Sequence, residues 1–128
     1  MGLMLATLAL AAAQPVAEPP VENEIEVIGR KLSEWRSTFN LRKGAFVCKT
    51  KRSTGDKVID ALGCDAIRAC MTPLIPQWQA INDADLPRKE AKQRFNALMK
   101  DNGFHECVFA EREAKIAALA AARRSKRI

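Results

Sequence analysis

Apart from the cysteines, the side chains best suited to chemistry are Asp56, Asp60 and His105. Asp56 and Asp60 stand four residues apart, so a helix would bring both carboxylates to one face, as a hydrolase could use. His105 is the only histidine, and it stands two residues before Cys107, which suggests a metal site or a nucleophile–base pair. However, residues two apart on a helix do not face each other, and the aspartates have no evident third polar partner. We predict no catalytic residue, no metal site and no cofactor, and a small hydrolase or metal-handling protein is the alternative.

The four cysteines, Cys48, Cys64, Cys70 and Cys107, are the other chemically informative residues. No two of them have the Cys-x-x-Cys spacing, so the pattern indicates no thioredoxin-like redox pair, zinc ribbon or haem attachment site. An even number of cysteines in a small exported domain is typical of structural disulfides. We predict that the four cysteines form two disulfides.

The predicted elements limit how these cysteines pair. Cys64 and Cys70 lie six residues apart on one predicted helix, hence ~9 Å, beyond the ~7 Å between Cα atoms that a disulfide allows. The strand that follows Cys48 runs ~13 Å outward, and the next helix brings the chain ~10 Å back by Cys64. We therefore prefer Cys48–Cys64 with Cys70–Cys107. The alternative is Cys48–Cys70 with Cys64–Cys107.

The first 13 residues have the features of a secretory signal peptide. The apolar run from Leu3 to Ala13 is too short for a membrane span of ~20 helical residues, and it ends in three alanines that satisfy the cleavage rule. No Lys or Arg precedes this run, unlike the usual basic start of a signal. We interpret residues 1–13 as a signal peptide cleaved after Ala13, and we expect a periplasmic or secreted protein.

Composition divides the remaining chain into three parts. Residues 14–23 contain Pro15, Pro19 and Pro20 beside glutamates, which predicts a disordered linker. Residues 24–122 carry all four cysteines and the periodic apolar segments, so we expect one disulfide-stapled domain there. Residues 123–128 are rich in Arg and Lys and are expected to form a basic tail.

The mature chain is strongly basic. The net charge is +6, and from Arg30 onward there are 21 basic and 11 acidic residues. Six basic residues of the predicted hairpin are the candidates for binding an anionic surface: Arg36, Arg42, Lys43, Lys49, Lys51 and Arg52. Outside the cytoplasm the available polyanions are lipid headgroups, lipopolysaccharide and cell-wall polymers, so we expect no nucleic-acid partner. We predict an anionic envelope surface or another envelope protein as partner, unless the charge serves only solubility.

An alternating pattern predicts a hairpin. Residues 35–42 alternate between apolar or small and polar side chains, as in a strand with one buried face, and residues 45–52 follow after a Lys-Gly turn. The predicted pairs are Leu41 with Phe46, Phe39 with Cys48, and Ser37 with Thr50. A shift of one residue would expose Phe46 and Cys48, so the register is well specified. Residues 24–29 also alternate and are expected to form a further short strand.

Four helices are predicted in the rest of the chain. Apolar spacing and turn residues place them at about residues 57–71, 73–81, 86–100 and 106–123. The last helix is expected to pack through its small residues, which are Cys107, Ala110, Ala114, Ala117 and Ala121. The predicted fold class is therefore α+β and helix-dominated. It has a short antiparallel hairpin, with residues 24–29 as a third strand, covered by about four helices and held by two disulfides.

Two segments resemble known proteins. The opening Glu24-Ile25-Glu26-Val27-Ile28-Gly29-Arg30 resembles the start of many exported alphaproteobacterial proteins, including outer-membrane receptors. The stretch from Cys48 to Asp56, continued through Cys64 and Cys70, is similar to small exported proteins of those bacteria with unassigned function. The resemblance implies a location and a cysteine framework, and it transfers no activity. Because no catalytic or cofactor motif is evident and the hairpin is basic, we expect a non-enzymatic binding or interaction module with anionic envelope components as its ligands.

Overall fold

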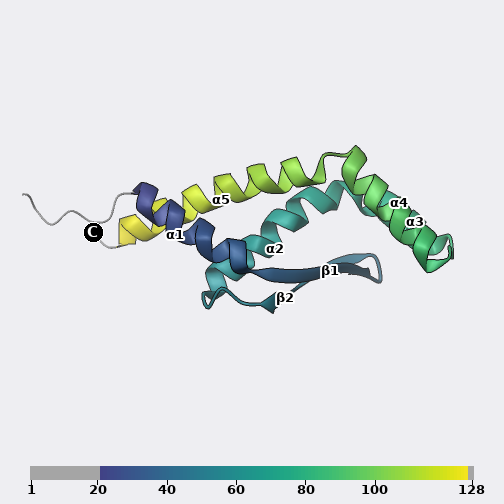
Figure 1. Ribbon diagram of the computed structural model, residues 1–128, viewed down its shortest axis with the longest axis horizontal. Helices are drawn as coiled ribbons and strands as arrows, with labels where there is room; N and C mark the ends of the chain where they lie inside the picture. Colours follow the sequence, from purple (N-terminus) through teal and green to yellow (C-terminus); the bar gives the residue numbers. More distant parts are fainter. Residues whose placement is uncertain (1–20, 127–128) are drawn as a thin grey trace, which may run out of the picture.

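The computed structural model describes residues 21–126, with side chains described from residue 23 onward. The elements in chain order are α1 (Val21–Glu34), β1 (Arg36–Arg42), β2 (Ala45–Arg52), α2 (Lys57–Met71), the 3₁₀ turn η1 (Thr72–Leu74), α3 (Ile75–Asp83), α4 (Arg88–Asp101) and α5 (Phe104–Lys126). Figure 1 shows an elongated molecule in which α5 runs along most of its length. Both α1 and α2 contact α5, the hairpin lies on the other side of α2, and α3 and α4 pack together at the end far from α1.

The hairpin forms in the predicted register. All three predicted pairs occur in the antiparallel β1–β2 ladder, including Phe39 with Cys48. The two-residue turn at Lys43-Gly44 has positive φ at both positions, 52° and 78°, which matches the right-handed twist of the strands on either side. A side chain at Gly44 would be strained in this conformation, so the glycine is what allows so tight a turn.

The strand predicted for residues 24–29 is wrong, because these residues belong to α1. The alternation spans only six residues, whereas the helical spacing of Ile25, Ile28 and Leu32 continues past its end. Ile28 and Leu32 are each only 2% exposed, and Ile25 packs against the same core. A strand would place Ile25 and Ile28, three residues apart, on opposite faces, whereas a helix places them on one. The sheet described here therefore has two strands. α1 also includes residues 21–23 of the predicted linker, and residues 1–20 lie outside the described part of the chain.

Aromatic rings connect the hairpin to three helices. The Phe39 ring lies 6.0 Å from Trp78 of α3, 6.3 Å from Phe95 of α4 and 6.0 Å from Phe104 of α5, measured between ring centroids. At the other end of the hairpin, Trp35 is 4% exposed and packs between α1 and α2. The inner face of the hairpin is thus anchored by the partly buried Phe39 at mid-strand and by the buried Trp35 at the start of β1.

The two disulfides have the preferred connectivity. Cys48–Cys64 joins β2 to the middle of α2, and Cys70–Cys107 joins the last turn of α2 to the first turn of α5. The Cα atoms are 5.8 and 5.9 Å apart, within the usual range. The predicted bounds of α2 are confirmed at both ends, and this helix is cross-linked to its neighbours on both sides.

The face of α5 that was expected to pack is the wrong one. Ala110, Ala114 and Ala117 are exposed, whereas Ile116 and Ala120 are buried against α1 and α2. Alanine occurs on every side of this helix, so its distribution does not specify a buried face, and the larger Ile116 does. α5 also continues to Lys126, so the basic tail predicted for residues 123–128 begins within the helix.

Candidate functional site

Alternation along the two strands places a group of polar and basic side chains on the outer face of the hairpin. We define the outer face as Thr38, Asn40 and Arg42 of β1 with Val47, Lys49 and Lys51 of β2. In the ladder, Thr38 lies opposite Lys49 and Asn40 lies opposite Val47. Together with Phe39, these six residues line a shallow hollow of ≈ 210 Å³. Except for Val47, their side chains are exposed, so this hollow opens to solvent.

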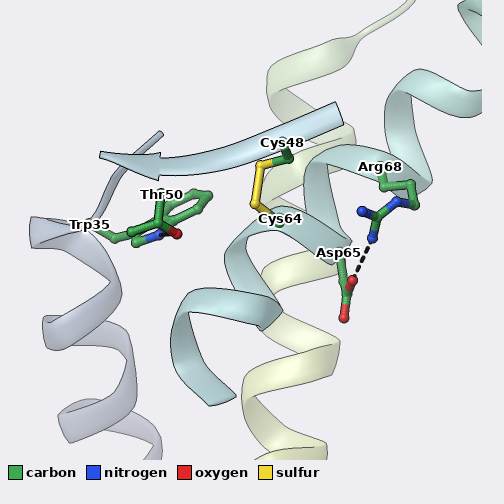
Figure 2. The surroundings of a disulfide bond; sticks show 6 residues. All are labelled: Trp35, Cys48, Thr50, Cys64, Asp65 and Arg68. Atoms are coloured by element: carbon green, nitrogen blue, oxygen red, sulfur yellow. Dashed lines mark hydrogen bonds and ion pairs between the residues drawn. A yellow bond between two sulfur atoms is a disulfide. The ribbon is translucent and has the colours of Figure 1, made fainter. Parts of the chain in front are cut away.

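Two contacts behind the strands hold the outer face rigid. Trp35 Nε1 donates a hydrogen bond of 2.9 Å to Thr50 Oγ1, across the start of β1 and the end of β2. The disulfide from Cys48 to Cys64 fixes β2 to α2, and Figure 2 shows this bond with Trp35 and Thr50 on one side of it. Since both strands are anchored to the core, the outer face needs little further ordering to bind a ligand.

The six predicted binding residues do not form a single group. Arg42, Lys49 and Lys51 line the hollow, and Lys43 stands beside it in the turn. Arg36 does not line the hollow. Its Nη1 atom instead donates hydrogen bonds to the carbonyl oxygens of Ser33 and Trp35 at the end of α1. Arg52 pairs with Arg36 at the far end of the hairpin, beyond an irregularity that leaves Lys51 as an extra residue on β2. None of the six forms an ion pair within residues 23–126.

Two polar residues of the hollow, Thr38 and Asn40, were not predicted as site residues. Asn40 Oδ1 accepts a hydrogen bond of 2.8 Å from the Leu41 backbone, which leaves the amide NH₂ group as a donor. Thr38 adds a hydroxyl group next to Lys49. Both share the alternation of Arg42, so listing every residue of that face, and not only the charged ones, would have found them.

Asp56 caps α2 and ties it to the end of α5. Its carboxylate accepts hydrogen bonds from the backbone N–H groups of Val58 and Ile59 and one of 2.6 Å from Arg123 Nη2. Burial raises the pKa of Asp56, but the hydrogen bonds from Arg123 and from these two N–H groups outweigh it, so the pKa lies below its usual value. Arg123, predicted to belong to a tail, therefore has a structural role.

Asp60 is held in the same way by the loop before α2. Its carboxylate accepts hydrogen bonds from Ser53 Oγ and from both the N–H and the hydroxyl of Thr54. Burial and the neighbouring charge of Asp56 raise the pKa of Asp60. The hydrogen bonds from Ser53 and Thr54 lower the pKa by more than this, so it lies below its usual value. Ionised carboxylates with engaged oxygens are poor proton donors, so this pair does not favour the alternative hydrolase.

We expect Asp56→Asn to lower the free energy of unfolding by about 1 kcal/mol at pH 7, because asparagine keeps the cap but loses the ion pair with Arg123. The pKa of folded Asp56 is lowered, so the ion pair stabilises the fold above pH ~4 and its contribution is lost as the pH falls through the folded pKa. The cost should therefore be smaller at about pH 2 than at pH 7. Urea unfolding followed by circular dichroism at both pH values measures it.

Asp85→Asn is the matched control for that experiment. Asp85 is exposed in the turn between α3 and α4, makes no hydrogen bond or ion pair among residues 23–126, and has a positive φ of 51° that asparagine tolerates. Its replacement should change stability little at either pH. An equal cost of Asp56→Asn at pH 7 and pH 2 would contradict the role of the Arg123 charge.

His105 lies at the surface near the start of α5, where its ring is 5.7 Å from that of Phe104. Within residues 21–126, no group of three or more His, Cys, Asp or Glu side chains is placed to hold a metal ion. None of the helices in this part of the chain is long and apolar enough to cross a membrane.

The functional interpretation depends on the geometry of the hairpin's outer face. Comparison with protein-family models, curated proteins and solved structures found no match. The structure alone therefore identifies the outer face of the hairpin as the candidate site, because three cations and two neutral polar side chains line one hollow there.

Proposed function

We propose that this protein is an exported, non-enzymatic binding module whose hairpin outer face attaches to a phosphate-bearing anionic surface of the cell envelope. The observation that carries the proposal is the charge of this face. Arg42, Lys49 and Lys51 surround the hollow without an ion-pair partner in residues 23–126, and residues 36–52 contain no acid at all. A rigid group of unpaired cations attracts polyanions at long range and contacts their phosphates at short range.

Export is part of this proposal, and the disulfides support it. All four cysteines are paired, and structural disulfides persist in oxidising compartments rather than in the cytosol. The predicted signal, residues 1–13, lies outside the described residues. If the proposal is right, the polyanions that the outer face meets are those of the envelope.

The hairpin is a better binding surface than the C-terminal end. Arg123 is paired with Asp56, so it is not available to a ligand without a cost to the fold. In contrast, the strands are held from behind by Cys48–Cys64, and the exposed bases need only side-chain ordering on binding. Each basic residue close to an anionic membrane contributes ~1 kcal/mol, so three together suffice for measurable attachment.

We expect the triple variant Arg42→Glu/Lys49→Glu/Lys51→Glu to bind anionic vesicles at least about 100-fold more weakly than the wild type, since it loses three attractions of ~1 kcal/mol each. Sedimentation with vesicles of phosphatidylglycerol and phosphatidylcholine, against phosphatidylcholine alone, measures this difference. Wild-type binding should also weaken steeply between 0.1 M and 1 M salt, where the Debye length falls from ~10 Å to ~3 Å. For these experiments the protein is purified from an envelope extract. Its intact mass should correspond to the chain without residues 1–13, because the predicted signal is cleaved after Ala13.

The matched control is Arg88→Glu/Lys89→Glu/Lys92→Glu, which changes the net charge equally on the exposed surface of α4. Removal of residues 125–128 tests the C-terminal end and leaves the Arg123–Asp56 pair in place. Neither change should weaken binding more than about tenfold if the hairpin carries the contact. Equal losses in the two triple variants would contradict the assignment to the hairpin, and no binding by the wild type would contradict the proposed function.

A further inference from the structure

A groove follows α5, between this helix and residues of α1, β1 and α2. It consists of two adjacent hollows, of ≈ 290 Å³ and ≈ 230 Å³. The first is lined mainly by Phe39, Ile67 and Val108, and the second by Gly29, Leu32 and Ile116, between α1 and α5. Phe109 and Arg112 line both hollows, so we treat them as one surface, the α5 groove. Together they fall within the size range of small-molecule sites.

Phe109 is the first sign that this groove serves a ligand. Its side chain is 66% exposed, the highest exposure among the large apolar residues found at the surface of the described chain. A phenyl ring left in water forgoes the free energy of burial, and here it stands between two hollows with mostly apolar walls. A bound apolar chain would cover it.

Arg112 is the second sign, because it is an unpaired cation in an apolar setting. Its guanidinium lies 5.7 Å from the ring of Trp35, and its Nε atom is shielded from solvent without a hydrogen-bond acceptor. Within residues 23–126 it forms no ion pair, and Glu111, one residue away, is engaged with Lys115 at 2.9 Å. Burial lowers the pKa of Arg112, which remains charged at neutral pH and lacks a counter-ion.

We propose that the α5 groove binds a medium-chain fatty acid, with its carboxylate on the Arg112 guanidinium and its acyl chain in the hollow between α1 and α5. The guanidinium fork matches a carboxylate, and Leu32, Ile116 and Phe109 provide the apolar walls. A single cation with Glu113 at the rim of the same hollow favours a monoanion over a doubly charged phosphate. This inference does not rest on the proposed function, because none of its charged groups belongs to the outer face.

Calorimetric titration with hexanoate, octanoate and decanoate, below their micelle concentrations, tests the proposal. Affinity should rise roughly fourfold for each methylene added, until the hollow is filled. Decanoate should bind at least about tenfold more tightly than decanol, which lacks the charge that Arg112 recognises. Quenching or shift of tryptophan fluorescence gives a second readout, because Trp35 lies under the guanidinium.

Two variants separate this site from nonspecific binding. Arg112→Gln should weaken decanoate binding by about 10- to 100-fold and leave decanol binding nearly unchanged. Gly29→Leu should weaken both probes, because a side chain at Gly29 enters open space beside the second hollow without meeting other atoms. This second variant also keeps the test valid if Arg112→Gln folds poorly, which circular dichroism will show. Decanoate binding that is absent in the wild type, or unchanged in both variants, would overturn the proposal.

Discussion

Replacing Cys70 and Cys107 together by alanine is expected to lower the free energy of unfolding by about 4 kcal/mol, a large part of the 5–15 kcal/mol typical of a domain. The Cys70–Cys107 bond closes a loop of 37 residues, and a cross-link stabilises mainly by restricting the unfolded chain. It also joins α2 to α5, which make the most extensive contact between helices in the fold. Guanidinium unfolding of the oxidised proteins, followed by circular dichroism, measures the difference.

The matched control is Cys48→Ala/Cys64→Ala, which opens a loop of 16 residues and should cost about 3 kcal/mol. The larger cost is therefore expected for the pair that joins two helices, not for the pair that fixes the hairpin. Peptide mapping without reduction should recover only Cys48–Cys64 and Cys70–Cys107 from the wild type. A larger loss for the hairpin pair, or mapped Cys48–Cys70 peptides, would contradict this account.

The hairpin could be predicted from sequence because its signals are local and agree with one another. Alternation over two strands, a Lys-Gly turn and the requirement to bury both Phe46 and Cys48 specify one register, and that register is observed. The same holds for α2, where Asp56 supplies a cap and the apolar residues recur at helical spacing. The preferred disulfide pairing followed from these two elements, so it was correct for the same reason.

The errors arose where a local pattern fits two structures. Residues 24–29 alternate like a strand, yet Ile25 and Ile28 also have helical spacing, and the contact with α5 decides between the two. In α5, alanine lies on every side, so only the packing of α1 and α2 shows which side is buried. Both choices depend on partners distant in the sequence.

The candidate site was likewise predictable only where its residues follow from a local pattern. Arg42, Lys49 and Lys51 follow from the alternation, but the capture of Arg36 by the end of α1 depends on how the helix enters the strand. The Arg123–Asp56 pair joins residues 67 apart, and Arg112 contacts Trp35, which lies 77 positions earlier in the chain (112 − 35). No local sequence signal predicts these contacts, because the first depends on how α5 packs against α2 and the second on how it packs beside the end of α1.

Trp35 is expected to be the single most costly side chain to remove among those of the hairpin: Trp35→Ala should lower the free energy of unfolding by about 4 kcal/mol. The side chain is 4% exposed, packs against α2 and donates a hydrogen bond to Thr50. Its closest neighbour is Gly63 in the middle of α2. A Cβ atom at Gly63 would lie only 2.7 Å from the Trp35 ring, so this glycine is there to admit the indole.

Gly63 makes this prediction testable by a change of sign. In the wild type, Gly63→Ala should destabilise by about 1–2 kcal/mol, because the collision with Trp35 outweighs the ~1 kcal/mol that alanine gains in a helix. In the Trp35→Ala protein the ring is gone, so the same Gly63→Ala change should stabilise by about 1 kcal/mol. Urea unfolding of the four proteins with their disulfides intact completes the cycle. Equal destabilisation by Gly63→Ala in both backgrounds would contradict this account. The close approach of Trp35 would then not be the reason for the glycine, and the indole would not determine how the start of β1 packs on α2.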